Sequence, residues 1–228
     1  MLKLVALALA PVLAIILFIY VKDKYEKEPL GLLIRSFFMG VLSVIPALLL
    51  EILAGNLEIF KGTEFHSVAL FAFVGVGFSE EFSKFIFLRL FIYKNKNFNE
   101  AFDGIVYAVM ISMGFAAAEN IMYVLKGGET VAWLRMFTAI PAHASFAVLM
   151  GFYIGKAKFS ASNSFLFLFN ALFIATVFHG AYDFFLMLKD YSGLAVFSLI
   201  TLILGIVLSF KSIKSSSENS PFRHFRFK

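Results

Sequence analysis

The chain has 228 residues, of which 61% are hydrophobic and only 15% are charged, and its mean hydropathy is +0.87. Because a soluble domain carries about 25% charged residues, this composition excludes an ordinary soluble protein and indicates an integral membrane protein. The formal net charge of +5 does not indicate a nucleic-acid-binding protein, because the basic residues are divided among short segments between apolar runs. There is no cysteine, so disulfides are excluded and metal ligands would have to be His, Asp or Glu.

Apolar runs long enough to cross a bilayer recur along the whole sequence. A hydrocarbon core of about 30 Å requires a helix of about 20 residues, and we predict seven such helices: Leu4–Tyr20, Gly31–Ala54, Val68–Tyr93, Ala101–Leu125, Thr130–Tyr153, Ser164–Leu188 and Gly193–Phe210. The expected fold is all-α, a polytopic membrane helix bundle over residues 1–210 followed by a basic tail over residues 211–228. The first run lacks a small-residue cleavage pattern near its end, so we expect a retained anchor rather than a cleaved signal peptide.

The distribution of Lys and Arg predicts the orientation of this bundle. Twelve basic residues lie in the segments that follow the first, third, fifth and seventh predicted helices, against four on the opposite side. Because cytoplasmic loops carry the excess of Lys and Arg, we predict that the N-terminus lies outside the cell and that the tail is cytoplasmic. His66 falls in an outer loop and His224 in the tail, so we expect both to be solvated.

The run from Val68 to Tyr93 carries charged residues in its middle. Its centre reads Gly-Phe-Ser-Glu-Glu-Phe-Ser-Lys over residues 77–84. A charged side chain at bilayer depth costs at least about 2.5–3.5 kcal/mol on insertion scales. On a helix, Lys84 lies three residues from Glu81 and four from Glu80, so it can pair with either. One lysine cannot neutralise two acids, and the surplus carboxylate is the first indication of chemistry.

Three further predicted helices carry polar residues within their apolar runs. Glu119 and Asn120 lie in the fourth, His143 in the fifth, and His179 with Asp183 in the sixth. Glycines and alanines flank these residues, and such small residues let membrane helices approach closely. His179 and Asp183 are four apart, hence on one helical face, where the carboxylate can orient the imidazole. Counted along the predicted helices, the polar groups fall between the mid-plane and the outer third of the membrane.

Two histidines and three glutamates that face one cavity permit two kinds of chemistry. They can hold a divalent metal such as zinc, whose catalytic sites use three protein ligands and keep one position for water. Alternatively, a glutamate acts directly as general base on water, while His and Asn stabilise the oxyanion. Both routes hydrolyse a peptide or related acyl bond inside a membrane cavity, and the sequence leaves both open.

Each of these residues also has a structural interpretation. His143 alone can be a hydrogen-bonded packing residue, the Glu119-Asn120 pair can be interfacial polarity, and His179 with Asp183 can tie two helices together. Buried Glu, Lys and His also occur in ion- or proton-coupled transporters, which are the alternative function class. The paired glutamates and the two separate histidines favour hydrolysis, and we find no inverted repeat of the kind common in transporters.

Charged residues near the predicted helix ends receive a simpler interpretation. Glu51, Asp103 and Arg135 lie at or near such ends, and we expect all three to be interfacial.

The four motifs together resemble those of the PrsW family, bacterial intramembrane proteases that cleave an anti-sigma factor from outside the membrane. The resemblance covers roughly residues 78–183, and its motifs are Glu80-Glu81-x-x-Lys84, Phe115-x-x-x-Glu119-Asn120, Ala142-His143 and His179-x-x-x-Asp183. The family is in turn similar to type II CAAX prenyl endopeptidases. In their first motif an Arg stands one position after the place that Lys84 has here, and in their second motif a His stands where this chain has Glu119.

The resemblance implies a catalytic site and a kind of substrate. It implies that Glu80, Glu81 and His179 are essential and that Glu119 and His143 complete the site. The full candidate set is Glu80, Glu81, Glu119, Asn120, His143, His179 and Asp183, with Lys84 in support. We favour a bound zinc ion held by Glu80, Glu119, His143 and His179. The implied substrate is a single-span membrane protein, an anti-sigma factor, in a bacterial cytoplasmic membrane, and a non-catalytic scaffold related to the CAAX-type proteases is a further alternative.

Overall fold

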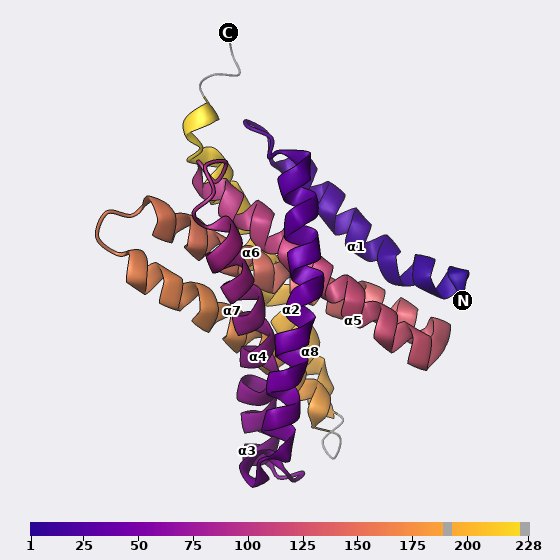
Figure 1. Ribbon diagram of the computed structural model, residues 1–228. Helices are drawn as coiled ribbons and strands as arrows, with labels where there is room; N and C mark the ends of the chain where they lie inside the picture. Colours follow the sequence, from indigo (N-terminus) through magenta and orange to yellow (C-terminus); the bar gives the residue numbers. More distant parts are fainter. Residues whose placement is uncertain (189–192, 224–228) are drawn as a thin grey trace.

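The computed structural model of the chain describes residues 1–188 and 193–223, and every regular element in this part is a helix (Figure 1). The helices are α1 (Leu2–Lys22), α2 (Leu30–Asn56), η1 (Glu58–Phe60), α3 (Phe65–Leu70), η2 (Phe71–Phe78), α4 (Ser79–Phe87), η3 (Leu88–Ile92), α5 (Ala101–Phe137), α6 (Ala139–Phe159), α7 (Ser164–Met187) and α8 (Val196–Glu218). The expected all-α fold is confirmed. Lys189, His224, Arg226 and Lys228, which entered the predictions on topology and solvation, lie outside the described residues.

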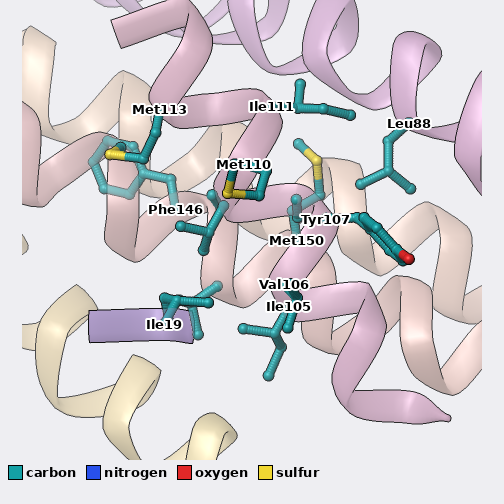
Figure 2. Packing of buried hydrophobic residues seen from close by; sticks show 14 of the residues in the cluster. Ile19, Leu88, Ile105, Val106, Tyr107, Met110, Ile111, Met113, Phe146 and Met150 are labelled. Carbon is teal, nitrogen blue, oxygen red and sulfur yellow. The ribbon is translucent and has the colours of Figure 1, made fainter. Parts of the chain in front are cut away.

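Helices α5 and α6 form the centre of the bundle. The most apolar stretch of Ala101–Phe159 is 89% buried, whereas the corresponding stretches of the other long helices are only 22–28% buried. The outer helices therefore present most of their apolar side chains outward, as expected for surfaces that contact lipid. The buried cluster is built largely from α5, with Ile105, Met110 and Met113 beside Phe146 and Met150 of α6 (Figure 2).

Glycines allow the surrounding helices to approach α5 closely. A Cβ atom added at Gly40 of α2 would lie 1.8 Å from the carbonyl oxygen of Ile111, and one at Gly151 of α6 would lie 2.3 Å from that of Gly104. No side chain fits at these positions, so backbone packs directly against backbone. This packing fixes α2 and α6 against the central helix.

Five helical segments are long and apolar enough to cross a membrane: Leu2–Lys22, Leu30–Asn56, Ala101–Phe159, Ser164–Met187 and Gly193–Glu218. The chain is therefore a multi-pass membrane protein. The predicted third helix, Val68–Tyr93, is helical throughout, but it consists of two short α-helices and two π-helical stretches, none of them long enough by itself. The predicted fourth and fifth helices both fall within the single segment Ala101–Phe159.

The predicted boundary between the fourth and fifth helices coincides with a break inside α5. We expected the fourth helix to end at Leu125 and the fifth to begin at Thr130, and between them Gly128 has non-helical backbone angles (φ +72°, ψ −160°), after which helix continues to Phe137. The chain then breaks at Thr138 and α6 begins at Ala139. Glycine adopts positive φ without a steric penalty, so the chain turns here while hydrogen bonding continues on both sides.

The last helix also extends beyond its predicted end. Helix α8 runs to Glu218, eight residues past Phe210, so the first part of the segment expected as a tail is helical. Ser, Lys and Glu make up this part except for Ile213, so the apolar run ends at Phe210 and only the structure shows that the helix continues.

Candidate functional site

The paired glutamates follow directly on a π-helical stretch. η2 covers Phe71–Phe78, and the α-helical turn that carries Glu80, Glu81 and Lys84 begins at Ser79. π-helical turns widen the backbone locally and occur often at functional sites. All three charged side chains are buried, and they point into the bundle rather than toward lipid.

Lys84 contacts both acids, as the spacing predicted. Its Nζ lies 3.0 Å from Oε2 of Glu80 and 2.8 Å from Oε1 of Glu81. It also lies 3.3 Å from Nδ1 of His143, and 4.1 Å from the centre of the Phe115 ring. A desolvated ammonium over an aromatic face gains cation–π attraction, so the lysine is held by two carboxylates, an imidazole and a ring at once.

Each histidine has a carboxylate at one of its ring nitrogens. Nε2 of His143 lies 2.8 Å from Oε2 of Glu119, and Nδ1 of His179 lies 2.8 Å from Oε1 of Glu81. Such a partner fixes the orientation of an imidazole and determines which nitrogen carries the proton. The other nitrogen of each ring is thereby turned toward the middle of the cluster.

The middle of the cluster lies beside Glu80. Oε2 of Glu80 is 4.0 Å from Nδ1 of His143 and 3.9 Å from Nε2 of His179. Asp183 lies 3.3 Å from the same nitrogen of His179, as the four-residue spacing predicted. The structure thus brings three separate motifs of the sequence, carried by α4, α6 and α7, to one point.

Four buried residues meet the geometric condition for sharing one metal ion. Glu80, Glu81, His143 and His179 each offer one ligand atom, and these four atoms lie within 4.8 Å of one another. Glu119 is close by but on the far ring nitrogen of His143, so it lies outside this group. The buried atom Oε2 of Glu81 has no hydrogen-bond partner among the described residues.

Asn120 is directed away from the cluster. Its amide donates to the carbonyl oxygen of Ala8 at 2.9 Å, and its Oδ1 accepts from Nε of Arg135 at 2.7 Å. Arg135 also lies 3.1 Å from Oε2 of Glu119. A chain of polar contacts therefore runs from the backbone of α1 through Asn120 and Arg135 to Glu119.

Two residues that we expected to be interfacial belong to the surroundings of the site. Arg135 binds Glu119, and Glu51 of α2 is near enough to Glu80 and Glu119 for their charges to interact. Arg135 had a usable signal, because it lies inside a predicted membrane helix, where an arginine is expensive. Glu51 had the same signal, since it lies within the predicted helix Gly31–Ala54, but only the packing of α2 against α4 shows that it is close to the site.

Aromatic and hydroxyl side chains complete the surroundings of the histidines. The ring of Phe146 stacks on His179, with 5.2 Å between ring centres, and the two histidine rings meet edge to face at 5.2 Å. Ser112 of α5 donates to the backbone carbonyl of His143 at 3.0 Å. Packing on several sides leaves the imidazoles little freedom to turn.

A close approach between η2 and α7 brings the glutamates to His179. A Cβ atom added at Gly77 would lie 2.9 Å from the backbone nitrogen of Gly180, and one at Gly180 would lie 2.7 Å from the Cα atom of Phe73. Gly77 is three residues before Glu80, and Gly180 directly follows His179. The small residues noted in the sequence therefore set the distance between the two halves of the site.

A multi-pass helical bundle with buried glutamates and histidines at one point defines a class of protein, the membrane-embedded hydrolases that use Glu and His. Comparison with known sequences gives the family. The profile described as "PrsW family intramembrane metalloprotease" matches residues 28–210, which is most of the chain. The chain belongs to the PrsW family, and it is an intramembrane protease.

Several relatives carry the name Protease PrsW. The one from Geobacillus kaustophilus is 36% identical over 203 residues, covering 87% of this chain and 88% of the relative. That from Bacillus subtilis is 36% identical over 187 residues, covering 82% and 84%. That from Oceanobacillus iheyensis is 33% identical over 220 residues, covering 96% and 99%. No solved structure matches the chain. The predicted family is confirmed. Membership of this family favours the protease over the two alternatives, a transporter and a non-catalytic scaffold.

Proposed function

We propose that the chain hydrolyses a peptide bond of a single-span membrane protein at a site formed by Glu80, Glu81, His143 and His179. One observation carries the proposal: these four buried residues converge within 4.8 Å, and each histidine is held on its other side by a carboxylate. A structural tie between helices requires one acid and one base. Two acids and two bases around one point, in a family of proteases, favour catalysis.

The donor set fits a bound divalent metal. Glu80, His143 and His179 supply one carboxylate and two imidazoles, the ligand set of many catalytic zinc sites. Glu119 contacts Nε2 of His143 and Glu81 contacts Nδ1 of His179. A carboxylate at the second ring nitrogen is usual for histidines that hold zinc. We therefore propose Glu80, His143 and His179 as the ligands and revise the predicted role of Glu119 from ligand to support. A bound zinc ion would supply Lewis acidity, which polarises a carbonyl and acidifies water.

Glu81 is the proposed general base. Its Oε1 is occupied by Lys84 and His179, whereas its Oε2 is buried without a partner among the described residues. A buried carboxylate oxygen without a partner is costly, and a water molecule at this position would relieve the cost. In the proposed reaction Oε2 takes a proton from that water, whose oxygen attacks the scissile carbonyl carbon. The proton then passes to the departing amide nitrogen as the C–N bond breaks.

The remaining polar residues position the site. Arg135 neutralises Glu119 and keeps it on His143, and Asn120 holds Arg135. This assigns Asn120 a positioning role in place of the predicted oxyanion stabilisation. Lys84 balances the charge of Glu80 and Glu81, and Asp183 lies beside Nε2 of His179, where it adds a carboxylate at the edge of the site.

The same proposal includes a topology and a substrate class. Seven membrane crossings with the N-terminus outside and the tail inside follow from the apolar runs and from the distribution of Lys and Arg. The site would then open on the outer half of a bacterial cytoplasmic membrane. The family resemblance supports an anti-sigma factor, a membrane-anchored protein with an extracytoplasmic part, as substrate.

The test is cleavage of a single-span reporter protein by the purified chain in proteoliposomes. We expect Glu81→Gln to lower the cleavage rate by about 10²–10⁴-fold, the usual contribution of a general base. Glu80→Gln and His179→Ala should be equally damaging, while Glu64→Gln, at an exposed loop position, should cleave like the wild type. Normal cleavage by Glu81→Gln would contradict its role as base.

A further inference from the structure

A second group of acids lies at one end of the bundle, away from the protease site. Glu26 and Glu28 are in the segment between α1 and α2, and Asp103 is in the first turn of α5. Asp23, at the end of α1, and Glu100, just before α5, lie beside them. Figure 1 shows this end of the molecule at the top, where α1 ends, α2 begins and α8 ends.

Three of these acids are placed as ligands of one ion would be. Glu26, Glu28 and Asp103 each offer a carboxylate oxygen, and the three atoms lie within 4.8 Å of one another. Oxygens that share a calcium or magnesium ion at about 2.0–2.6 Å from it are separated by at most about 4–5 Å. The two segments that carry these acids are far apart in the sequence, because Asp103 is 75 residues from Glu28.

Buried oxygens in this group have no partner. Asp23 is 1% exposed and Glu28 3% exposed, while Asp103 is fully buried. Among the described residues, both side-chain oxygens of Asp23 and one oxygen each of Glu26, Glu28 and Asp103 are buried without a hydrogen bond. Buried carboxylates are normally paired, or they coordinate a metal.

The nearby lysines form no ion pairs with these acids among the described residues. Nζ of Lys158 donates to the backbone oxygens of Tyr93 at 2.6 Å and Asn95 at 3.1 Å, and Nζ of Lys27 contacts the backbone oxygens of Tyr20 and Asp23. Within residues 1–188 and 193–223, no lysine or arginine nitrogen lies within 4.0 Å of any of the five carboxylates.

The hydrogen bonds to Glu28 and Asp103 each use only one of the two carboxylate oxygens. The hydroxyl of Tyr107 donates to Oε2 of Glu28, while the ring of Tyr107 packs in the core with its oxygen pointing out of the apolar cluster (Figure 2). Oδ2 of Asp103 accepts from the backbone N–H groups of Asn99 and Glu100 at 2.7 and 2.9 Å. Glu28 and Asp103 are thus each fixed through one oxygen, and the other oxygen of each has no hydrogen bond among the described residues.

We propose that Glu26, Glu28 and Asp103 form a binding site for a hard divalent cation of the Mg²⁺, Mn²⁺ or Ca²⁺ type, with Asp23 as a further carboxylate beside it. The donor set is oxygen alone, which suits these cations better than zinc. The ion would join the segment between α1 and α2 to the start of α5. It is a structural site that shares no residue with the protease site, and it does not depend on the proposed mechanism.

The test uses Mn²⁺ as the probe, with electron paramagnetic resonance to measure free Mn²⁺ during a titration. The full chain is purified in detergent with His143→Ala, which removes a proposed protease-site ligand, and is then stripped with a chelator. We expect about one tightly bound Mn²⁺ per chain, displaced by Mg²⁺ or Ca²⁺. Glu26→Gln or Glu28→Gln added to this background should weaken binding at least tenfold, and Glu64→Gln should leave it unchanged.

Two outcomes would overturn the proposal. One is the absence of a tight Mn²⁺ site in the His143→Ala chain. The other is a site that Glu26→Gln and Glu28→Gln do not weaken. Glu26→Gln is the safer variant, because Glu26 is only partly buried. Its melting temperature without Mn²⁺ shows whether a loss of binding is a loss of fold.

Discussion

At the scale of single residues, carboxylates and one guanidinium control the two imidazoles of the site. Glu119 and Glu81 each bind one ring nitrogen, and Arg135 keeps Glu119 in place. Without Arg135, Glu119 would face Glu80 and Glu81 across the histidines with less positive charge between them. In the proposed mechanism, Arg135 therefore acts through His143 and does not itself touch the substrate.

This arrangement predicts a loss of activity in Arg135→Gln with little loss of fold. Removal of a residue that supports a metal ligand costs about 10–100-fold in metal affinity or activity. Arg135→Lys should recover part of the activity, because an ammonium keeps the positive charge. It cannot contact both Glu119 and Asn120 as the planar guanidinium does. The reporter cleavage rate in proteoliposomes measures both.

Arg89→Gln is the matched control, since its guanidinium lies over the ring of Tyr93, at 4.3 Å from the ring centre, rather than in the site. Cleavage by Arg135→Gln at the wild-type rate would show that Glu119 does not need its cation.

At the scale of helices, the distance between η2 and α7 decides whether Glu81 reaches His179. The approach depends on Gly77 and Gly180, which leave no room for a side chain. In Gly180→Ala the new Cβ atom would lie 2.7 Å from the Cα atom of Phe73, and a clash with backbone cannot be relieved by a rotamer change. We expect a destabilisation of about 1–3 kcal/mol, the usual cost of overpacking, and reduced cleavage.

Gly55→Ala provides the comparison, because a Cβ atom at Gly55 meets nothing within 4 Å. Its melting temperature in detergent should equal or slightly exceed that of the wild type, since Ala is a better helix former than Gly. If Gly180→Ala were as stable and as active as Gly55→Ala, close packing at this crossing would not be what builds the site.

Helix-scale features also mark what the sequence could and could not predict. Long apolar runs identify the membrane helices, and charges inside those runs identify Glu80, Glu81, His143 and His179, because both signals are local. The break at Gly128 was also predicted locally, because it lies between the two predicted helices that end at Leu125 and begin at Thr130, whereas the second break at Thr138 and the extension of α8 to Glu218 gave no clear local signal. The same holds for Asn120, whose partners on α1 and at Arg135 are far away in the sequence.

At the scale of the whole molecule, the proposed orientation decides on which side of the membrane the site opens. The chain contains no cysteine, so single cysteines report position without a background. Thr63→Cys lies in the exposed segment between α2 and α3, and Ser162→Cys in the exposed segment between α6 and α7. In intact cells we expect an impermeant maleimide to label Thr63→Cys and not Ser162→Cys. The reverse pattern would place the N-terminus in the cytoplasm.

The two groups of possible metal ligands lie in different parts of the molecule. Buried Glu and His side chains from α4, α6 and α7 meet inside the bundle, whereas the acids at the ends of α1, α2 and α5 gather at one end of it. The first set contains nitrogen and oxygen donors and the second oxygen alone, so the two should prefer different metals. Zinc content therefore reports on the first site.

The most direct test of the central claim is the zinc content of the purified chain, measured by elemental mass spectrometry beside His143→Ala and His179→Ala. Both histidines are proposed ligands, so we predict about one zinc per chain in the wild type and its loss in each variant. His66→Ala, at an exposed histidine outside the site, should keep the ion. A well-folded, proteolytically active wild type without zinc or another bound metal would contradict the metal site and leave Glu81 to activate water alone.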